Sequence, residues 1–586
     1  MNSKFDNNEI SPLSILKRIN KHLETKRKRQ MFWVLTLSIF ASLCESISIA
    51  LLIPFINLFI NPETYFFNDL FKKIFEYLNI DNQKDILELV TFTFILIVFL
   101  SIIIKYLHIK KSNYLSDQIT SDFRIRIFNF LVNQNYSYYF KHSTNELMSN
   151  LTQKTGFFTV VIFAAINILN SVLISLAVIS VLIYNEPFYS TIIIISIITF
   201  FFIIFKIKSN TVLEKGQNVS INQNIIIDTF ENTVGYLQEV IVYNLKNFFL
   251  STLTKVSKEI ARSNTQIRSL GMTPKVFLEG FGIIFVILLI YFSNFKNQST
   301  ALNISYLAIL AFAAQKCLPL INSIYNLSIS FKQSIPPIMN FLNILDKENT
   351  TFKDHKQDYK LMRFNKEINL KNIYYRYNKN SPYIFENLNL TIKKGEKIAI
   401  KGRTGSGKST LINLILGLIE PNKGQLLIDG GTINSSNIKN WQKNIALVPQ
   451  TIFLNNATVL ENIAIGEKNA EINQERAEKS AAKAHISDFI KSLPNKYNEK
   501  VGEKGIRLSG GQKQRIGIAR ALYRNFNIII LDEPSNALDL KTEEKVADTL
   551  SKIDKEKTLI MISHSENTLK FFDRILDIDK LSQIND

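Results

Sequence analysis

The sequence contains almost no cysteine, and it has fewer acidic than basic residues. Cys44 and Cys317 are the two cysteines in 586 residues, and both lie in apolar runs. A disulfide framework is therefore excluded, while the redox compartment stays open. The shortage of acid leaves a formal net charge of +19. Nucleic-acid binding is one cause of such an excess. A content of 46% hydrophobic residues with long uncharged runs instead favours a membrane protein with cationic loops on one face, and we expect no nucleic-acid partner.

A cleavable signal sequence is not apparent either. The basic run of residues 26–29 precedes an apolar stretch that is too long for a signal peptide, and no small-residue cleavage site follows it. We expect residues 1–30 to form a cytoplasmic N-terminal segment, followed by an uncleaved membrane helix.

Six apolar runs are each long enough, or nearly so, to cross a hydrocarbon layer about 30 Å thick. They cover residues 31–60, 87–109, 158–184, 188–207, 276–293 and 302–330. The pattern predicts an all-α transmembrane domain of six helices over residues 31–345. On one side of the membrane the segments 1–30, 105–156 and 206–275 carry 24 Lys and Arg residues, against 4 in the loops on the other side. Because positive charge collects on the cytoplasmic side, both termini are expected in the cytoplasm.

Three connecting segments have a distinctive pattern. The turns at residues 136–143 and 234–243 are aromatic and apolar, so they either dock on another domain or are simple surface turns. Between the first two runs, residues 64–80 repeat apolar side chains at helical spacing. This pattern predicts an amphipathic helix, either in the outer membrane interface or packed on the helix bundle.

Ionisable side chains within apolar spans are unfavourable unless they face a cavity or a partner. Lys316 lies in the middle of the sixth run, Lys275 opens the fifth, and Lys105 lies towards the end of the second. These three lysines are candidate substrate ligands. Alternatively, Lys316 pairs with Glu45 or Glu279 for structural reasons, and the other two extend their amines to the membrane surface.

The second half of the chain has the composition of a soluble domain. Residues 346–365 are polar and without periodicity, which predicts a linker, and residues 366–586 alternate short apolar strands with helices. A glycine-rich loop lies between the strand 398–400 and the helix 411–416, the context that a phosphate-binding loop requires. Its candidate nucleotide ligands are Gly402, Thr404, Gly405, Ser406, Gly407, Lys408, Ser409 and Thr410. Lys408 is placed to reach the terminal phosphates, and the Ser409 hydroxyl to bind Mg²⁺.

Several polar residues follow predicted buried strands of the same domain. Asp532 and Glu533 end the strand 528–531, so they reach the edge of the sheet where parallel sheets bind ligands. We expect Asp532 to hold Mg²⁺ and Glu533 to polarise the hydrolytic water. Gln450 is a further candidate for the metal or the water, and His564 for the γ-phosphate and the water.

A second glycine-containing loop precedes a predicted helix. Its members Ser509, Gly510, Gly511 and Gln512 offer a hydroxyl and free backbone amides at a helix start, which favours a second anion site. Two such sites in one domain are explained if each nucleotide is held between the phosphate loop of one subunit and this loop of another. The pattern therefore predicts a dimer.

Together these motifs resemble those of an ATP-binding cassette protein. They correspond to its Walker A loop (402–410), Q-loop (Gln450), signature (508–512), Walker B strand with catalytic glutamate (528–533), D-loop (536–539) and switch histidine (His564). Tyr377 resembles the aromatic residue that stacks on adenine. Six spans before one cassette resemble an exporter half-transporter, a six-helix membrane domain fused to an α/β P-loop ATPase. The resemblance implies a homodimer with two head-to-tail ATP sites, ATP and Mg²⁺ as cofactors, and the turns 136–143 and 234–243 as coupling helices.

Within that family the sequence is most similar to PglK-type flippases of lipid-linked oligosaccharides. The similarity rests on residues 75–80, 274–280 and 316–319. It implies a bacterial cytoplasmic (inner) membrane and a polyprenyl-pyrophosphate-linked glycan as substrate, with Lys275 and Lys316 where that flippase has cavity arginines. Export of another lipid, a peptide or a drug remains the alternative within the class. An ATP-gated channel or a regulator without turnover is the alternative from another class.

Overall fold

The structure, a computed structural model, describes residues 11–60, 83–185, 187–294, 300–351, 360–534 and 540–581. It divides into two compact units. The first contains the helices up to Gln134 and from His142 through α12; the second contains Asn135–Lys141 and the described residues from Lys360 onwards. The predicted amphipathic helix at residues 64–80 lies outside the described residues.

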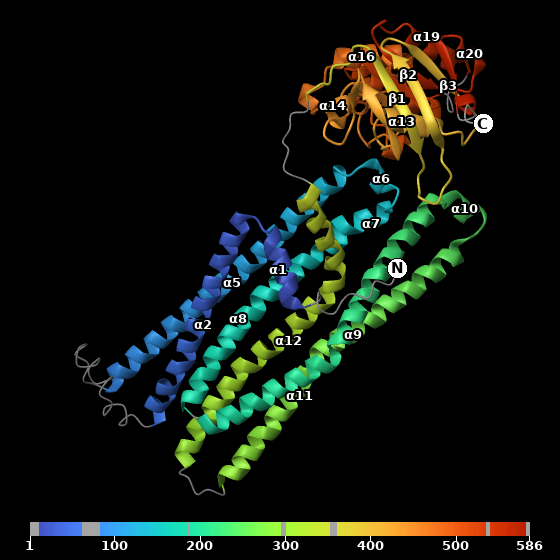
Figure 1. Cartoon of the computed structure of the whole chain (residues 1–586). Coiled ribbons are helices and arrows are strands. Elements are labelled where there is room, and N and C mark those ends of the chain that lie inside the picture. Colours follow the sequence, from blue (N-terminus) through green and yellow to red (C-terminus); the bar gives the residue numbers. More distant parts are fainter. Residues whose placement is uncertain are drawn as a thin grey trace. The chain divides into compact units, whose positions relative to one another are not determined.

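The described part of the first unit consists of helices, six of which are long (Figure 1). In chain order they are α1 (Pro12–His22), α2 (Thr25–Ile60), α5 (Gln83–Val132), α7 (Thr144–Ser149), the π-helix η1 (Asn150–Lys154), α8 (Thr155–Asn185), α9 (Pro187–Gly235), α10 (Leu237–Val242), α11 (Lys246–Asn294) and α12 (Thr300–Thr351). The six predicted apolar runs each lie within one of the helices α2, α5, α8, α9, α11 and α12. Among the described residues, three segments are long and apolar enough to cross a membrane: Thr25–Ser48, Glu88–Val132 and Thr144–Ser180.

Most of these helices extend well beyond their apolar runs. The helices α9 and α11 pack against each other along their length, and α12 packs on α8 and α9. The helix α12 continues through Thr351, so the first six residues of the expected linker are helical. Apolar spacing locates the membrane-crossing part of a helix but not its end, because the polar continuation is stabilised by packing and hydrogen bonds instead.

Aromatic and ionic contacts tie the first unit together. Phe158 on α8 packs between Phe123 of α5 and Phe341 of α12, with ring centroids 5.1 and 4.7 Å apart. On α2, the guanidinium of Arg27 donates to both carboxylate oxygens of Asp122 on α5, at 2.6 and 3.1 Å. Such a two-pronged pair fixes orientation as well as distance.

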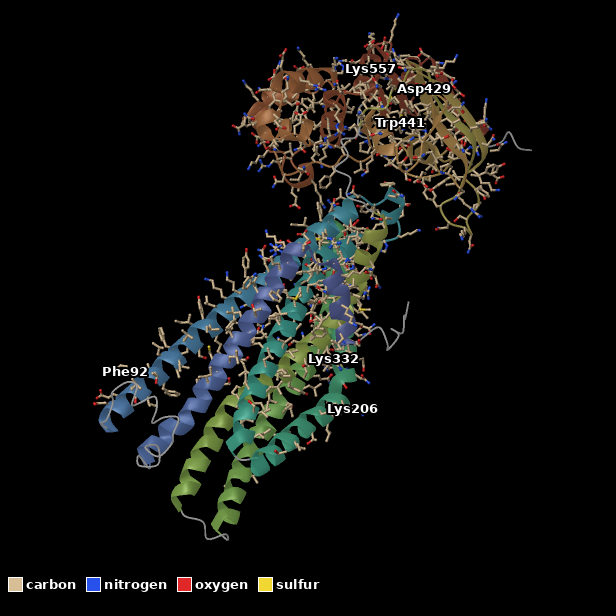
Figure 2. The ribbon with its side chains drawn as sticks, turned by 60° about the vertical axis from the view of Figure 1, so that its left-hand side comes forward. Phe92, Lys206, Lys332, Asp429, Trp441 and Lys557 are labelled. Atoms are coloured by element: carbon tan, nitrogen blue, oxygen red, sulfur yellow. The ribbon has the colours of Figure 1, made fainter. Side chains whose placement is uncertain are left out.

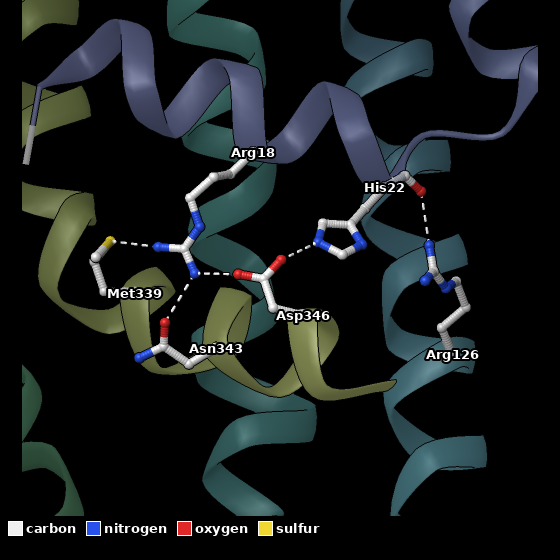
Figure 3. A network of polar contacts seen from close by, with 6 residues as sticks. All are labelled: Arg18, His22, Arg126, Met339, Asn343 and Asp346. Atoms are coloured by element: carbon white, nitrogen blue, oxygen red, sulfur yellow. Dashed lines mark hydrogen bonds and ion pairs between the residues drawn. The ribbon is translucent and has the colours of Figure 1, made fainter. Parts of the chain in front are cut away.

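The short N-terminal helix α1 is bound to the end of α12 by a network of polar contacts (Figure 3). Arg18 donates to Asp346 at 2.6 Å and to the amide oxygen of Asn343 at 2.8 Å. The buried ring of His22 lies 2.8 Å from the other oxygen of Asp346, and Arg126 of α5 donates to the His22 carbonyl at 2.7 Å. Three helices therefore meet at this point.

The second unit contains two sheets. One is antiparallel, with strand order β2-β1-β4-β5, and the other is parallel, with order β6-β7-β8-β3-β9. The strands are β1 (Glu367–Tyr375), β2 (Phe385–Lys393), β3 (Lys397–Lys401), β4 (Lys423–Ile428), β5 (Gly431–Thr432), β6 (Ile445–Val448), β7 (Ile528–Leu531), β8 (Thr558–Ile562) and β9 (Arg574–Asp577). The α-helices are α6 (Tyr136–Tyr139), α13 (Lys408–Ile415), α14 (Ile438–Gln442), α15 (Val459–Ile463), α16 (Gln474–Lys483), α17 (Ser487–Ser492), α18 (Gly510–Tyr523), α19 (Leu540–Ser551), α20 (Glu566–Leu569) and α21 (Ile578–Leu581). Short 3₁₀ turns cover Asn469–Glu471, Lys496–Asn498 and Glu503–Gly505.

The parallel sheet separates two hydrophobic clusters. Alternate residues of β7 enter different clusters: Ile528 and Ile530 pack with the helix α13, whereas Ile529 and Leu531 pack with α18. Successive side chains of a strand point to opposite faces, so α13 and α18 cover opposite faces of the sheet. The two predicted anion-binding helix starts are therefore separated by the sheet within one chain.

Two residues of the second unit that are labelled in Figure 2, Asp429 and Trp441, make hydrogen bonds to the backbone of other segments. Asp429 accepts backbone N–H bonds from Asn365, Lys366 and Glu367 at 2.7–2.9 Å, which fixes the entry into β1. Burial alone would raise the pKa of Asp429, but these three hydrogen bonds outweigh it and lower the pKa below its usual value. The fully buried Trp441 donates its indole N–H to the Ile415 carbonyl at 2.9 Å, so it satisfies the end of α13.

Candidate functional site

Four neighbouring parallel strands deliver the predicted site residues to one edge of the sheet. The phosphate loop follows β3, Gln450 follows β6, Asp532 and Glu533 follow β7, and His564 follows β8. The strand ends are held in register by backbone bonds, such as that from the Asp532 N–H to the Val448 carbonyl at 2.9 Å. The carboxyl edge of a parallel sheet is where such folds bind ligands, and the site lies there.

The phosphate loop has the backbone conformation that its glycines allow. Gly405 and Gly407 have φ angles of +86° and +96°, which L side chains rarely adopt. A Cβ on Gly407 would come within 2.6 Å of the Ile384 side chain. Gly407 also caps α13, so the amides of the helix start face the loop.

The side chains of the loop have few partners within the chain. The buried Lys408 amine donates to the carbonyls of Gly402 and Arg403, at 2.9 Å each. Within the described part of the chain, the buried hydroxyl of Ser406 has no hydrogen-bond partner. A buried polar group without a partner is unfavourable, and a phosphate oxygen in the loop would satisfy this one. The loop thus fits a phosphate group, as its sequence predicts.

The donors predicted for a metal lie next to each other. The Ser409 hydroxyl is 3.5 Å from Oδ1 of Asp532, and both are oxygen ligands of the kind that Mg²⁺ prefers. Burial, followed by the charge of Glu533, raises the pKa of Asp532. A divalent cation next to Asp532 would offset the effects of burial and of the Glu533 charge. Ser409 and Asp532 therefore fit a bound Mg²⁺.

Glu533 is held between the two other polar residues predicted for the site. The amide of Gln450 donates to one of its oxygens at 2.8 Å, and Nε2 of His564 is 3.5 Å from the other. The backbone of Glu533 has φ +48°, a left-handed conformation that is uncommon for a residue other than glycine. Such strain is typical of functional sites, and here it accompanies the carboxylate predicted to polarise water.

The aromatic residue predicted to stack on adenine contacts the phosphate-loop helix directly. The hydroxyl of Tyr377 is 3.1 Å from that of Thr410, and its ring lies 5.2 Å from Tyr375 and 6.0 Å from Phe140. Phe140 belongs to Asn135–Lys141, which clusters with the second unit. The sequence indicated that this turn was apolar enough to dock, but not that its ring would meet Tyr377.

The signature loop lies on the other face of the sheet. Ser509 caps α18: its hydroxyl accepts from the Gln512 N–H at 3.3 Å, and the Gln512 side chain accepts from the Ser509 N–H at 2.8 Å. Gly510 and Gly511 occupy the first turn, where backbone N–H groups have no partner within the helix. Within one chain, Ser509–Gln512 and the phosphate-loop helix α13 lie on opposite faces of the sheet. The D-loop residues 536–539 lie outside the described residues.

The candidate substrate lysines belong to the first unit. The amine of Lys105 is 3.2 Å from Glu45, and that of Lys275 is 3.8 Å from Glu279, so both of these lysines pair with a carboxylate. The Lys275 side chain is still 59% exposed. Lys316 lies on α12, and its side chain is outside the described residues.

Comparisons with known proteins identify the family of the chain. The profile of the ABC transporter family matches residues 385–536. The "multidrug resistance-like ATP-binding protein MdlA" of Buchnera aphidicola is 30% identical over 508 residues, covering 83% of this chain and 84% of that protein. The chain belongs to the ABC transporter family. It has the family's ATPase domain, and its relatives include ATP-driven exporters.

Further relatives of the transporter include proteins named as flippases. The "ATP-dependent lipid A-core flippase" of Photorhabdus laumondii is 26% identical over 478 residues, covering 80% of each chain. The protein of the same name in Syntrophus aciditrophicus is 28% identical over 510 residues, covering 86% of this chain and 82% of that one. In fold, the transporter is similar to a solved "bacterial Atm1-family ABC exporter with ATP bound", with a TM-score of 0.75 and 20% identity over 95% of this chain and 94% of that one.

Proposed function

We propose that the transporter is a homodimeric, Mg²⁺- and ATP-dependent flippase of the bacterial inner membrane. Its substrate would be an anionic amphiphile, in the first place a polyprenyl-pyrophosphate-linked oligosaccharide, carried from the inner to the outer leaflet. The observation that supports ATP turnover best is the position of Glu533 between Gln450 and His564, next to Asp532 and the phosphate loop. A channel or regulator without turnover would not require this arrangement.

In the proposed cycle, Ser409 and Asp532 would hold Mg²⁺, which would supply positive charge to neutralise the ATP phosphates. The residues of the chain supply the rest. Lys408 exchanges its carbonyl partners for terminal phosphate oxygens, and Glu533 accepts a hydrogen bond from the hydrolytic water and turns it towards the γ-phosphate. Gln450 and His564 orient the Glu533 carboxylate for this role.

Two features support a dimer. First, α13 and α18 cover opposite faces of the sheet, so a signature loop can meet a phosphate loop only if it comes from a second copy. Second, the turn between α9 and α11 exposes a group of large apolar side chains. They are Val234, Tyr236, Leu237, Ile241, Val242 and Tyr243, and each is at least half exposed. An exposed apolar group of this size indicates a contact surface, and the ATPase domain of the partner is the proposed occupant.

The substrate is inferred from the flippase names of two relatives and from the lysines Lys275 and Lys316. The name of the Buchnera relative favours drug export as a second candidate. To separate the two, ATP hydrolysis is measured in proteoliposomes with a polyprenyl-pyrophosphate glycan, lipid A, a hydrophobic peptide and a cationic dye. The glycan should stimulate hydrolysis most, and flipping of the labelled glycan should fall in Lys316→Ala. Stimulation by the dye alone would overturn the lipid-linked substrate.

A further inference from the structure

A polar cavity of about 330 Å³ lies between α9 and α11, within the first unit. Each helix lines it with residues one and two turns apart: Lys215, Asn218 and Asn222 on α9, and Glu259, Arg262 and Gln266 on α11. Residues at this spacing share one face of a helix, so two polar stripes face each other across the cavity. Its volume lies within the range of small-molecule sites.

A small apolar cluster lies next to the lining residues along α9 and α11. Val212 of α9 and Ile267 of α11 are buried together with Tyr325 and Ile329 of α12. Val212 lies about one helical turn before Lys215, and Ile267 is next to Gln266, so the polar lining adjoins this cluster. Ile221 is the apolar residue in the lining, and the other lining residues are polar or charged.

The two cations of the cavity are not used by the protein itself. Within the described residues, neither Lys215 nor Arg262 has a hydrogen-bond or ion-pair partner. This contrasts with Lys105 and Lys275, which both pair with a carboxylate. Glu259 is the one acidic residue of the lining, and its Oε2 accepts from the Asn222 amide at 3.4 Å. The lining thus keeps a net positive charge.

The combination of groups fits a phosphoryl anion. An arginine fork pairs with two phosphate oxygens at once, a lysine adds a point charge, and the amides of Asn218 and Gln266 are further donors. Free cations on a single helix face would usually be solvated. Arg262 and Gln266 are exposed and Lys215 is partly buried, so solvent reaches them, but here the two cations come from different helices and line one cavity together with neutral donors. This is an arrangement that a phosphoryl ligand can use.

We propose that this cavity binds the pyrophosphate of the substrate's head group through Arg262 and Lys215. The proposal rests on the proposed lipid-linked substrate. Arg262 and Lys275 lie on the same helix, 13 residues apart, which is about 20 Å along its axis. At about 100° per residue the two side chains lie on different faces of α11, so Lys275 is not part of the cavity.

The first experiment tests the site without transport. Inorganic pyrophosphate is titrated calorimetrically into the full-length protein without Mg²⁺, in a Lys408→Ala background that weakens binding at the phosphate loop. Adding Lys215→Gln and Arg262→Gln should weaken binding at least tenfold. The control pair Lys255→Gln and Lys258→Gln also removes two exposed cations of the same unit and should bind like the parent. Equal binding by both double variants, or no binding by the parent, would overturn the site.

The second experiment identifies the source of the phosphoryl group. Polyprenyl pyrophosphate in phosphatidylcholine vesicles is titrated against the ATPase activity of the otherwise wild-type protein. The double variant Lys215→Gln and Arg262→Gln should need at least ten times more lipid for half-maximal stimulation. A variant with Lys215→Gln and Arg262→Lys should need less lipid than this double variant. If the lipid response is equal in wild type and variant, the site takes free phosphate and the head-group assignment is wrong. If no lipid stimulates the wild type while pyrophosphate still binds, the proposed substrate fails and the anion site stands.

Discussion

His22 and Asp346 form a hydrogen bond of 2.8 Å that joins the end of the N-terminal helix α1 to the end of α12 (Figure 3). The same carboxylate accepts from Arg18 at 2.6 Å, so one acidic side chain holds two residues of α1. Asp346 is also among the last residues of α12, the helix that leads into the linker. The position of α1 is thereby coupled to the point where the helical unit ends.

Asp346→Asn should loosen this junction. Asparagine removes the charge and offers one acceptor where the carboxylate offered two, so either Arg18 or the buried His22 loses its bond to residue 346. Hydrogen bonds to charged groups contribute about 1.5–3 kcal/mol, and we expect a lower apparent melting temperature of the purified transporter. Asp117→Asn, at an exposed position of α5, is the matched control and should melt like wild type. Equal melting of both variants would contradict the proposed importance of the junction.

The junction should also weaken in mild acid. Burial lowers the pKa of His22, and the charges of Arg126 and Lys21 add to this effect, while Asp346 only partly opposes it. Since the folded state then binds a proton less readily than the unfolded state, stability falls as the pH drops below the ordinary value near 6.5. The pKa of Asp346 is itself lowered, so this residue stays ionised over the same range. The melting temperature of wild type should therefore decrease more between pH 7.5 and 5.5 than that of His22→Gln. Parallel curves for the two proteins would show that His22 is not the titrating group.

Glu533→Gln should abolish turnover while nucleotide binding persists. The amide cannot accept a proton from the hydrolytic water, and loss of a general base typically reduces rates by about 10²–10⁴-fold. Steady-state phosphate release is the measurement, and retained ATP after gel filtration shows that the site is intact. Glu420→Gln, at an exposed position after α13, should hydrolyse at the wild-type rate. Undiminished phosphate release by Glu533→Gln would remove the assignment of this residue.

The sequence predicts those parts of the structure that follow from local apolar patterns and from the parallel order of the strands. Four polar segments follow buried strands, and parallel strands bring their ends to one edge, so the sequence predicts Gln450, Glu533 and His564 at the same site. In the structure, Gln450 and His564 each lie within 3.5 Å of the Glu533 carboxylate. The six apolar runs likewise identified the long helices. Each of these inferences needs only the period of a pattern and the topology that it implies.

Contacts between distant segments were not accessible in the same way. Arg18 and Asp346 are 328 residues apart, and nothing in either local sequence specifies the other. The contacts of Trp441 with the end of α13 and of Phe140 with Tyr377 likewise join segments whose local sequences do not specify each other. Helix ends were also unpredictable: α12 continues beyond its apolar run because packing and ion pairs, rather than hydropathy, hold its last turns.

Asp532→Asn should remove metal binding without lowering the stability of the ATPase domain. Burial and the neighbouring Glu533 raise the pKa of Asp532, so its ionisation is less favourable in the folded than in the unfolded state. This unfavourable contribution is fully present above the raised pKa and absent below the ordinary value, and at pH 7.5 the asparagine removes it. Without nucleotide, the variant should therefore melt at or above the wild-type temperature. ATP with Mg²⁺ should raise the wild-type melting temperature well beyond the effect of ATP with a chelator, whereas the two conditions should be nearly equal for Asp532→Asn. A full Mg²⁺ effect in the variant would mean that Asp532 does not hold the metal.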